Sequence, residues 1–425
     1  MYNNAFLIRL ILLLFNINIS SQKYVKYPFK RLKPQSNKPL VETILQNDLE
    51  ITIEIGTPPQ KINLNLRSQY YTFFVSGSKV NYPIKKFNEN ESNTCKILND
   101  TIITYSGQEY SKGYKISETL MINGKKINDV TLILASEINY IESGNIGLRP
   151  IESGYTLGDF NFIYQIKKSA NFDNYSFSLN YLDDDNGELI IGTYPHNYDK
   201  RYNEKNLIFH KIGIYRDGLY WLFNVNNIKY GNSTLINYDY KCLINIEFGL
   251  ISAPGSMRSY FLDSYLSKNK CNPLVVNNII FYFCPEDNIK NFKDLVFYSK
   301  EFNYEFVFTY KDLFIKDNDK YIFGIVFYDN VLQYNSVWIF GHLFLKKYFL
   351  TFDLDKRIIG LYNKIEKSIF NWGLLFDVVL IVLILLLSLY IIFHLKKPRK
   401  IRANELQEDN YEYISALDKN TFNTT

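Results

Sequence analysis

The stretch Ile53–Val75, IEIGTPPQKINLNLRSQYYTFFV, decides how the chain folds. On both sides of its Pro-Pro pair, isoleucine and leucine alternate with polar residues, at positions 51, 53 and 55 and again at 62, 64 and 66. A period of two is typical of strands that bury one face. Gly56–Pro59 is a turn signal, because glycine tolerates unusual dihedrals and prolines cannot donate to a ladder. The pattern predicts a β-hairpin that ends at Leu66. A loop then begins at Arg67, a place where functional residues are common.

The N-terminus has the form of a secretory signal peptide. Arg9 precedes the apolar run Leu10–Phe15, and small polar residues follow at Ser20 and Ser21. We therefore expect residues 1–21 to be a signal peptide, with a short buried helix as the alternative. Residues 22–47 begin with a short basic stretch, and we expect either a propeptide or an N-terminal linker there.

The segment Val378–Leu395 is almost entirely leucine, isoleucine and valine, over the length of a membrane-spanning helix. Basic residues follow at once between 396 and 402, and the positive-inside rule makes that side cytoplasmic. The sequence predicts a type I membrane protein with a juxtamembrane linker over 363–377, a transmembrane helix over 378–395 and a cytoplasmic tail over 396–425. Its predicted location is the secretory or endolysosomal pathway or the cell surface. A buried core helix is the alternative.

The region between these segments is long enough for two lobes with cores of their own. Its many short alternating runs, broken by Asn, Asp and Gly, predict a mostly β fold. The net charge of +5 is modest and the basic residues are scattered, so we expect no nucleic-acid partner. Zinc-ligand spacings, phosphate-binding glycine loops and Gly-x-Ser-x-Gly turns do not occur in the sequence, so we expect no metal and no cofactor.

All four cysteines precede the apolar C-terminal segment, and an oxidising compartment permits disulfides. Cys271 and Cys284 are separated by a strand-like run, and we expect them to pair. The pairing of Cys95 and Cys242 stays open. Four Asn-x-Ser/Thr sequences are candidate glycosylation sites, at Asn90, Asn99, Asn174 and Asn232.

The residues Ile55–Gln60 match in full the hairpin Ile-Gly-Thr-Pro-Pro-Gln of the pepsin-like aspartic peptidases, and the chain resembles that family. Other segments are similar to the family's motifs and follow in its order: 87–88, 92–94, 103–105, 144–148, 177–179, 187–192, 220–221, 338–341, 344–345, 352–353 and 360. The resemblance implies an all-β, bilobal pepsin-like acid protease fold, with an N-terminal lobe over 48–205 and a C-terminal lobe over 206–362. It makes Tyr105 a candidate flap tyrosine; the alternative is an ordinary strand residue.

The family's chemistry needs one aspartate from each lobe, and the two carboxylates share a proton. The resemblance places the first aspartate at Arg67, where Asp-Thr-Gly-Ser has become Arg-Ser-Gln-Tyr, and the second at Asn245, where Asp-Thr-Gly has become Asn-Ile-Glu. Neither guanidinium nor amide can act as a general base. We therefore expect no competent catalytic pair, unless the resemblance misplaces Arg67 and it is a surface residue.

The neighbours of these two positions are candidate cleft residues: Ser68, Gln69, Tyr105, Ile246 and Glu247. A buried guanidinium is costly unless it is paired. Glu247 lies in the facing loop, so we expect an Arg67–Glu247 ion pair. A solvated loop carboxylate is the alternative.

Two functions of different kinds follow from these residues. The first is a membrane-anchored, pepsin-like protein without peptidase activity, which binds an extended polypeptide or protein as a scaffold, since strand-like pairing does not need the two aspartates. The protein would then be a monomer. The second is an active aspartic-type endopeptidase that uses a non-standard site. We favour the first, because function must be argued from the site and not from the fold.

Overall fold

The structure is a computed structural model. It describes residues 23–32, 39–106, 109–122, 124–151, 160–215, 218–328, 337–363 and 372–395. Two compact units divide the chain, Met1–Ile365 and Glu366–Thr425. The expected signal peptide and cytoplasmic tail lie outside the described residues.

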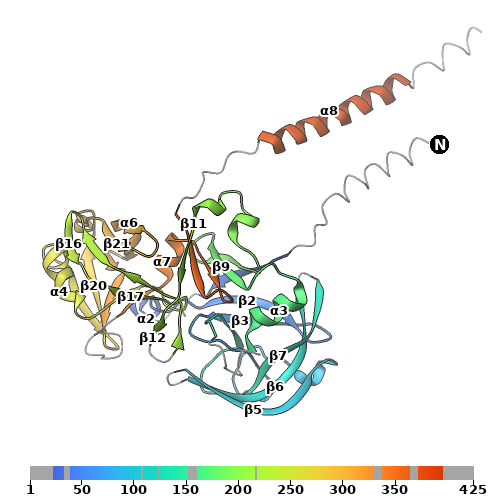
Figure 1. Ribbon diagram of the computed structural model, residues 1–425, viewed down its shortest axis with the longest axis horizontal. Coiled ribbons are helices and arrows are strands. Elements are labelled where there is room, and N and C mark those ends of the chain that lie inside the picture. The colour runs from blue at the N-terminus through green and yellow to red at the C-terminus, as the bar shows by residue number, and fades with distance from the viewer. Residues whose placement is uncertain are drawn as a thin grey trace, which may run out of the picture. The chain divides into compact units, whose positions relative to one another are not determined.

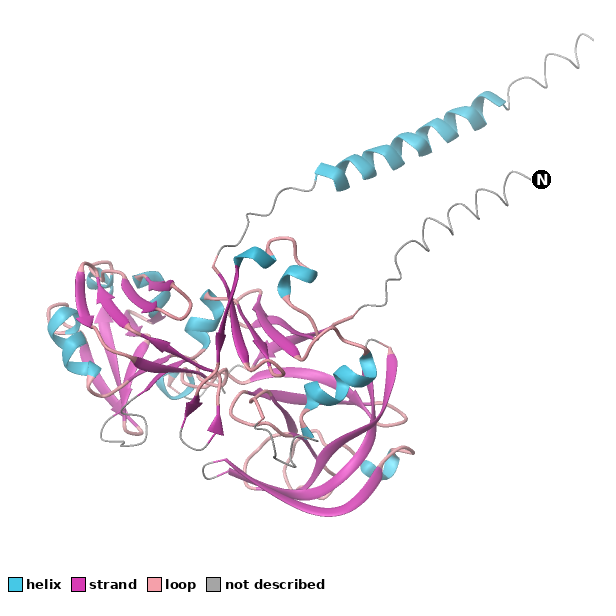
Figure 2. Cartoon of the chain, in the orientation of Figure 1, coloured by secondary structure: helices cyan, strands magenta, loops and turns pink. Residues whose placement is uncertain are grey.

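The first unit is built mainly of strands, as expected (Figures 1 and 2). The strands of its first half are β1 (Val25–Arg31), β2 (Leu49–Ile55), β3 (Gln60–Arg67), β4 (Phe73–Ser76), β5 (Lys96–Ser106), β6 (Glu109–Ile122), β7 (Lys125–Ile138), β8 (Gly144–Gly147), β9 (Ser176–Tyr181) and β10 (Asn186–Ile191). Its helices are α2 (Leu40–Thr43) and α3 (Phe162–Ala170).

The second half continues with short strands and short helices. The strands are β11 (Leu207–Lys211), β12 (Ile214–Tyr215), β13 (Gly218–Leu219), β14 (Leu222–Val225), β15 (Asn227–Tyr230), β16 (Ser233–Ile236), β17 (Tyr240–Ile244), β18 (Ile251–Ala253), β19 (Asn272–Val276), β20 (Ile279–Pro285), β21 (Leu295–Ser299), β22 (Tyr304–Phe308), β23 (Phe314–Asp317), β24 (Lys320–Phe323), β25 (Ile325–Tyr328), β26 (Val337–Phe340), β27 (Leu350–Asp353) and β28 (Ile358–Tyr362). The helices are α4 (Met257–Phe261), α5 (Glu286–Ile289), α6 (Tyr310–Leu313) and α7 (His342–Lys347).

The hairpin predicted around Gly56–Pro59 is present as β2 and β3. These strands pair antiparallel from Glu50 opposite Asn65 to Ile55 opposite Gln60. The apolar residues of both strands are buried and the intervening polar ones are more exposed, which is the period-two pattern of the sequence. Strand β3 runs one residue further than expected and includes Arg67, because Arg67 pairs with Gly147 of β8.

Each half of the first unit contains the same strand arrangement. In the first half, β3 is parallel to β8, β4 is antiparallel to β8, and β4 is parallel to β7. In the second half, β17 is parallel to β26, β18 is antiparallel to β26, and β18 is parallel to β25. The two arrangements therefore correspond strand for strand, as a bilobal fold with internal similarity requires.

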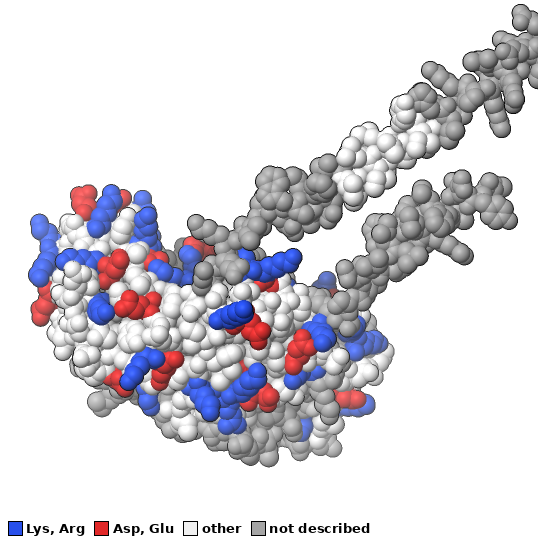
Figure 3. Space-filling model, turned by 45° about the horizontal axis from the view of Figure 1, so that its top comes forward, with Lys and Arg blue, Asp and Glu red and all other residues white. Residues whose placement is uncertain are grey.

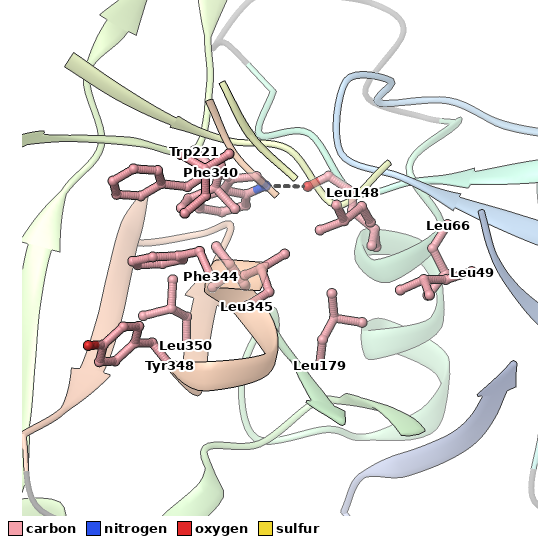
Figure 4. Packing of buried hydrophobic residues seen from close by; sticks show 14 of the residues in the cluster. Leu49, Leu66, Leu148, Leu179, Trp221, Phe340, Phe344, Leu345, Tyr348 and Leu350 are labelled. Carbon is pink, nitrogen blue, oxygen red and sulfur yellow. Dashed lines mark hydrogen bonds between the residues drawn. The ribbon is translucent and has the colours of Figure 1, made fainter. Parts of the chain in front are cut away.

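Both halves contribute to one sheet. Its order is β11-β28-β27-β9-β10-β1-β2-β3-β8-β4-β7-β6-β5, so three strands from the second half join the first half's strands. One buried cluster likewise spans both halves. Figure 4 shows part of it, where the indole nitrogen of Trp221 donates to the carbonyl of Leu148 over 2.7 Å.

The segment expected to be a propeptide or linker includes a strand of this sheet. Strand β1 pairs with β10 on one side and with β2 on the other. Val25, Tyr27 and Phe29 point into the core and are buried. Residues 25–31 are therefore a structural part of the folded unit.

In the second unit, the described element is helix α8 (Trp372–Leu395). Its side chains are placed from Leu380 to Ile391, and all of these are exposed. Among the residues so described, no helix has both the length and the apolar character of a membrane span.

Candidate functional site

Two corresponding loops form the centre of the first unit. One connects β3 to β4 and begins after Arg67, and the other connects β17 to β18 and contains Asn245. The amide of Gly147 donates to the carbonyl of Thr72 over 2.9 Å, and the amide of Gly341 donates to the carbonyl of Leu250 over 3.0 Å. Because each acceptor lies five residues after its loop's first site residue, Arg67 and Asn245 occupy equivalent positions.

Both glycines are required by the close approach of neighbouring backbone. A Cβ atom at Gly147 would lie 2.5 Å from the amide nitrogen of Thr72, and one at Gly341 would lie 2.1 Å from the carbonyl oxygen of Phe248. Real Cβ atoms are essentially never found at such distances. The two loops are therefore packed tightly against the ends of β8 and β26.

Ser68 joins the two loops through its hydroxyl group. Its Oγ accepts a hydrogen bond from the amide of Ile246 over 3.1 Å and donates one to Oε2 of Glu247 over 2.6 Å. Ser68 is 2% exposed, so these bonds are made out of water. The hydroxyl thus connects backbone and side chain of the second loop to the first loop.

Glu247 also accepts from the backbone of the first loop. Its Oε1 accepts the amide hydrogen of Gln69 over 3.1 Å. In the second loop, the equivalent amide belongs to Glu247 itself and donates to Oδ1 of Asn245 over 2.9 Å. Each loop thus has an amide, two residues after its site residue, that donates to a side-chain oxygen.

The two loops differ in which side chain accepts from the equivalent amide. In the second loop, the short side chain of Asn245 provides the acceptor for its own loop's amide. In the first loop, Arg67 provides none, and the carboxylate of Glu247 comes across from the other loop to accept from Gln69. The carboxylate therefore occupies the acceptor place that a short acidic side chain at position 67 would fill.

Arg67 turns away from this acceptor place and forms two other ion pairs. Its Nη2 lies 2.8 Å from Oε1 of Glu142, which also accepts from Nε over 3.0 Å, and its Nη1 lies 2.8 Å from Oδ1 of Asp48. The expected Arg67–Glu247 ion pair was wrong. Two closer carboxylates satisfy the guanidinium, and Ser68 and Gln69 satisfy Glu247.

The buried charges shift one another's pKa values. Burial opposes the charge of Arg67, but Glu142, Asp48 and Glu247 attract it, and its pKa rises above the ordinary value. Burial also raises the pKa of Glu142 and of Glu247, and Arg67 lowers each only in part. Three carboxylates therefore surround one guanidinium, two of them with weakened acidity.

Residues 45–47 of the N-terminal segment are hydrogen-bonded to the second loop. The amide of Asn47 donates to the carbonyl of Glu247 over 2.9 Å, and its side-chain nitrogen donates to the carbonyl of Ile246 over 2.6 Å. Gly249 donates in turn to the carbonyl of Leu45 over 2.7 Å. Residues 45–47 thereby hold the second loop against the first half.

Sequence reasoning missed Asp48, Glu142 and Asn47. A signal for Asp48 was available, because extending the register of Glu50 opposite Asn65 by two residues sets Asp48 opposite Arg67. Glu142 lies just before β8 and comes close to Arg67 because β3 pairs in parallel with β8. Strand β8 is more than seventy residues from Arg67 in the sequence, so no local pattern indicates this contact.

The other predicted residues have mixed outcomes. Ile246, in the second loop, is buried. Tyr105 belongs to β5, opposite Tyr110, but its side chain lies outside the described residues, as does that of Asn99. Of the remaining sequons, Asn90 and Asn232 are exposed, and Asn174 is half-buried. The Cys271–Cys284 disulfide is confirmed, and Cys95 and Cys242 are both unpaired.

On the face of the molecule shown in Figure 3, basic and acidic side chains are interspersed. Among the described residues, no group of histidine, cysteine, aspartate and glutamate could hold a metal ion.

No protein of curated function matches the sequence. The model of the family of eukaryotic aspartyl proteases, in contrast, matches the chain over residues 50–364. This range includes both loops, both copies of the strand arrangement and nearly all of the joint sheet. The chain belongs to the eukaryotic aspartyl protease family.

Proposed function

We propose that this member of the aspartyl protease family does not cleave peptide bonds and instead binds an extended polypeptide in the cleft of its bilobal fold. The observation that carries the proposal is the pairing of Arg67 with Glu142 and Asp48. A guanidinium stands where the first aspartate of the family would stand, and it is fixed by two ion pairs. It can neither accept a proton nor activate a water molecule.

The second position supports the same conclusion. The side-chain oxygen of Asn245 accepts the amide hydrogen of Glu247, as a carboxylate there would, but an amide does not titrate. The two loops are held together by the hydrogen bonds of Ser68 and Glu247. Such a linked pair of loops supports polypeptide binding without the proton transfer that the family's reaction needs.

The test uses the protein truncated after Ile365, which keeps the complete first unit. Reduced and carboxymethylated lactalbumin serves as an unfolded probe, and the disulfide-intact protein as the folded control. We expect saturable binding of the unfolded form alone, without fragments on a gel after incubation at pH 3 to 7. Tyr105→Ala should weaken binding, because the resemblance makes Tyr105 the candidate flap tyrosine. Tyr260→Ala, at an exposed tyrosine without such a role, should not. Cleavage of the probe, or equal binding of both forms, would refute the proposal.

A second candidate function is peptidase activity through a non-standard site, and Glu247 favours it. The half-buried carboxylate of Glu247, with a raised pKa, lies in the Asn245 loop and accepts from the backbone of the other loop. Such a group could act as a general base. Both its oxygens, however, already accept from Ser68 and Gln69, and no second carboxylate among the described residues is hydrogen-bonded to it. Probe cleavage that disappears in Glu247→Gln would establish this function in place of the first.

We also propose that the protein is anchored as a single-pass type I protein of the secretory pathway. The exposed apolar side chains from Leu380 to Ile391 support this, since a helix with such a surface needs apolar surroundings. The Cys271–Cys284 disulfide fits an oxidising compartment. Full-length protein should resist alkaline extraction from membranes and shift on deglycosylation, and Asn232→Gln should reduce that shift. Extraction by carbonate would contradict the anchor.

A further inference from the structure

A cavity of about 730 Å³ lies in the first unit, apart from the Glu247–Gln69 contact. Its walls come from both halves: the end of β1, helix α2, the turn between β9 and β10, the start of β23, and helix α7. This volume falls in the range of small-molecule sites, which run from roughly 300 to 1,000 Å³. Polypeptide binding at the two loops makes no use of this cavity.

The rim of the cavity is more basic than acidic. Five basic residues line it against three acidic ones. Two of the basic residues are already paired, Lys346 with Asp184 and Lys347 with Asp312. Lys311 and Lys316 are exposed, and no ion pair to a described carboxylate engages them.

The basic residues of the rim also affect the pKa of a histidine in the cavity wall. His342 is 4% exposed. The pKa of His342 is lowered to about 3, and burial is the largest cause. The positive charges of Arg31 and Lys346 also lower this pKa, by more than Asp184 and Asp185 raise it. The imidazole is therefore neutral, and it neither adds to nor cancels the basic rim.

The inner wall is apolar and offers few polar partners. Leu40, Ile44, Leu250, Phe314 and Leu343 line it. Of its polar groups, Thr43 Oγ1 donates to the carbonyl of Leu40 over 2.9 Å and the amide of Gly249 donates to the carbonyl of Leu45 over 2.7 Å, whereas Nδ1 of the buried His342 has no hydrogen-bond partner among the described residues. A peptide in this space would leave most of its own amides and carbonyls unpaired, at a cost that an acyl chain avoids.

We propose that this cavity binds an anionic amphiphile, with an acyl chain on the apolar wall and a carboxylate or phosphate head group at the basic rim. Lys311 and Lys316 bind the head group, and Leu40 and Leu343 contact the chain. The basic rim selects the charge. Among the described side chains of the wall, Nδ1 of His342 is the buried atom without a partner, and one such atom cannot pair the several amides and carbonyls of an acidic peptide, so the wall favours an acyl chain.

The test measures binding to the protein truncated after Ile365 by calorimetry, below the micellar concentration of each probe. Dodecanoate and dodecyl phosphate represent the two head groups, dodecanol lacks the charge, octanoate has a shorter chain, and an acidic peptide represents the other occupant. We expect one molecule of a charged dodecyl probe per protein. Octanoate should bind at least tenfold more weakly, because each buried CH₂ group contributes about fourfold.

The variants separate the rim from the general surface. Lys311→Glu with Lys316→Glu should weaken dodecanoate binding at least tenfold, whereas Lys268→Glu with Lys290→Glu, exposed lysines outside the cavity, should not change it. Leu40→Trp should weaken binding by filling the chain's space, with thermal unfolding as the check that it folds. Equal binding of dodecanol, no effect of the rim variants, or binding of the acidic peptide in place of dodecanoate would overturn the proposal.

Discussion

The carboxylate of Glu247 accepts a hydrogen bond from the backbone amide of Gln69 in the opposite half of the protein, over 3.1 Å. The equivalent amide in the other loop donates to the side chain of its own site residue, Asn245. Glu247 therefore provides the acceptor that Arg67 does not provide. If the resemblance to the family places its aspartates correctly at 67 and 245, restoring aspartates at these two positions would still leave Glu247 in contact with the amide of Gln69.

The first prediction concerns this restoration. The double variant Arg67→Asp with Asn245→Asp should remain inactive, because the new carboxylate at position 67 would compete with Glu247 for the amide of Gln69. The new aspartates and Glu247 would then lie close together, and Glu142 and Asp48 would lose the guanidinium that now pairs with them, so that not all of these carboxylates could ionise. Adding Glu247→Gly should be required for any cleavage of unfolded protein at pH 3 to 5, measured by the appearance of fragments. Activity of the double variant would show that Glu247 does not occupy the place.

The second prediction concerns the pair Arg67 and Glu142. Arg67→Leu alone should lower the free energy of unfolding by roughly 3 kcal/mol, because it leaves the buried carboxylate of Glu142 without its cation. Glu142→Leu alone should cost less, because Asp48 still pairs with the partly exposed guanidinium. The double variant should cost clearly less than the sum of the two. Urea unfolding of all four proteins gives the coupling energy. The exposed pair Lys229–Glu305 is the matched control and should show about 0 to 1 kcal/mol. Additive effects at Arg67 and Glu142 would mean that they do not interact.

The third prediction concerns pH. Burial raises the pKa of both Glu247 and Glu142 above the ordinary value of 4.5. The folded protein therefore holds these protons more tightly than the unfolded chain. Their contribution to stability is fully present below about pH 4.5 and is lost as the pH rises through the folded values. These two carboxylates should therefore lower the free energy of unfolding toward neutral pH, whereas His342, whose pKa is lowered, acts in the opposite sense below about pH 6.5.

Glu247→Gln should remove the Glu247 part of this slope, because the glutamine side chain does not titrate. Urea unfolding at a series of pH values between 4 and 8 provides the measurement. Glu305→Gln, at an exposed carboxylate, serves as the control and should leave the slope as it is in the unmodified protein. An unchanged slope in Glu247→Gln would contradict the assignment of a raised pKa to Glu247.

Local patterns predicted what local structure decides. The alternation around Gly56–Pro59 gave the β2–β3 hairpin, because the burial of one face fixes both strand and register. The Cys271–Cys284 pair followed from two cysteines flanking one predicted strand. The end of β3 was missed by one residue, since its last pairing is with β8, a strand remote in sequence.

The partners of Arg67 were not predictable in the same way. Chemistry alone required that a buried guanidinium be paired, and that requirement is met. It could not choose among acids, because Glu142 reaches Arg67 only through the parallel β3–β8 pairing, and Asp48 only through the hairpin register. Glu247, the acid nearest in the expected loop geometry, instead accepts hydrogen bonds from Ser68 and Gln69. The sequence alone does not show that these two residues donate to Glu247.

The last prediction concerns β1, in the segment where a removable propeptide was one expectation. Its three buried side chains lie between β10 and β2, in the middle of the joint sheet. Phe29→Ala should lower the free energy of unfolding by roughly 3 to 5 kcal/mol through loss of apolar contacts and the cavity left behind. Lys30→Ala, at the neighbouring exposed residue, should change it by no more than about 0.5 kcal/mol.

Removal of β1 should be more damaging, because β10 and β2 would lose their shared neighbour and expose unpaired backbone groups. We therefore expect mature protein to begin before Val25 when its N-terminus is sequenced. A variant that begins at Pro39 should aggregate or unfold, although it keeps the site residues from Asn47 onward. A stable protein that begins after Arg31 would show that β1 is dispensable and that the segment can be processed away.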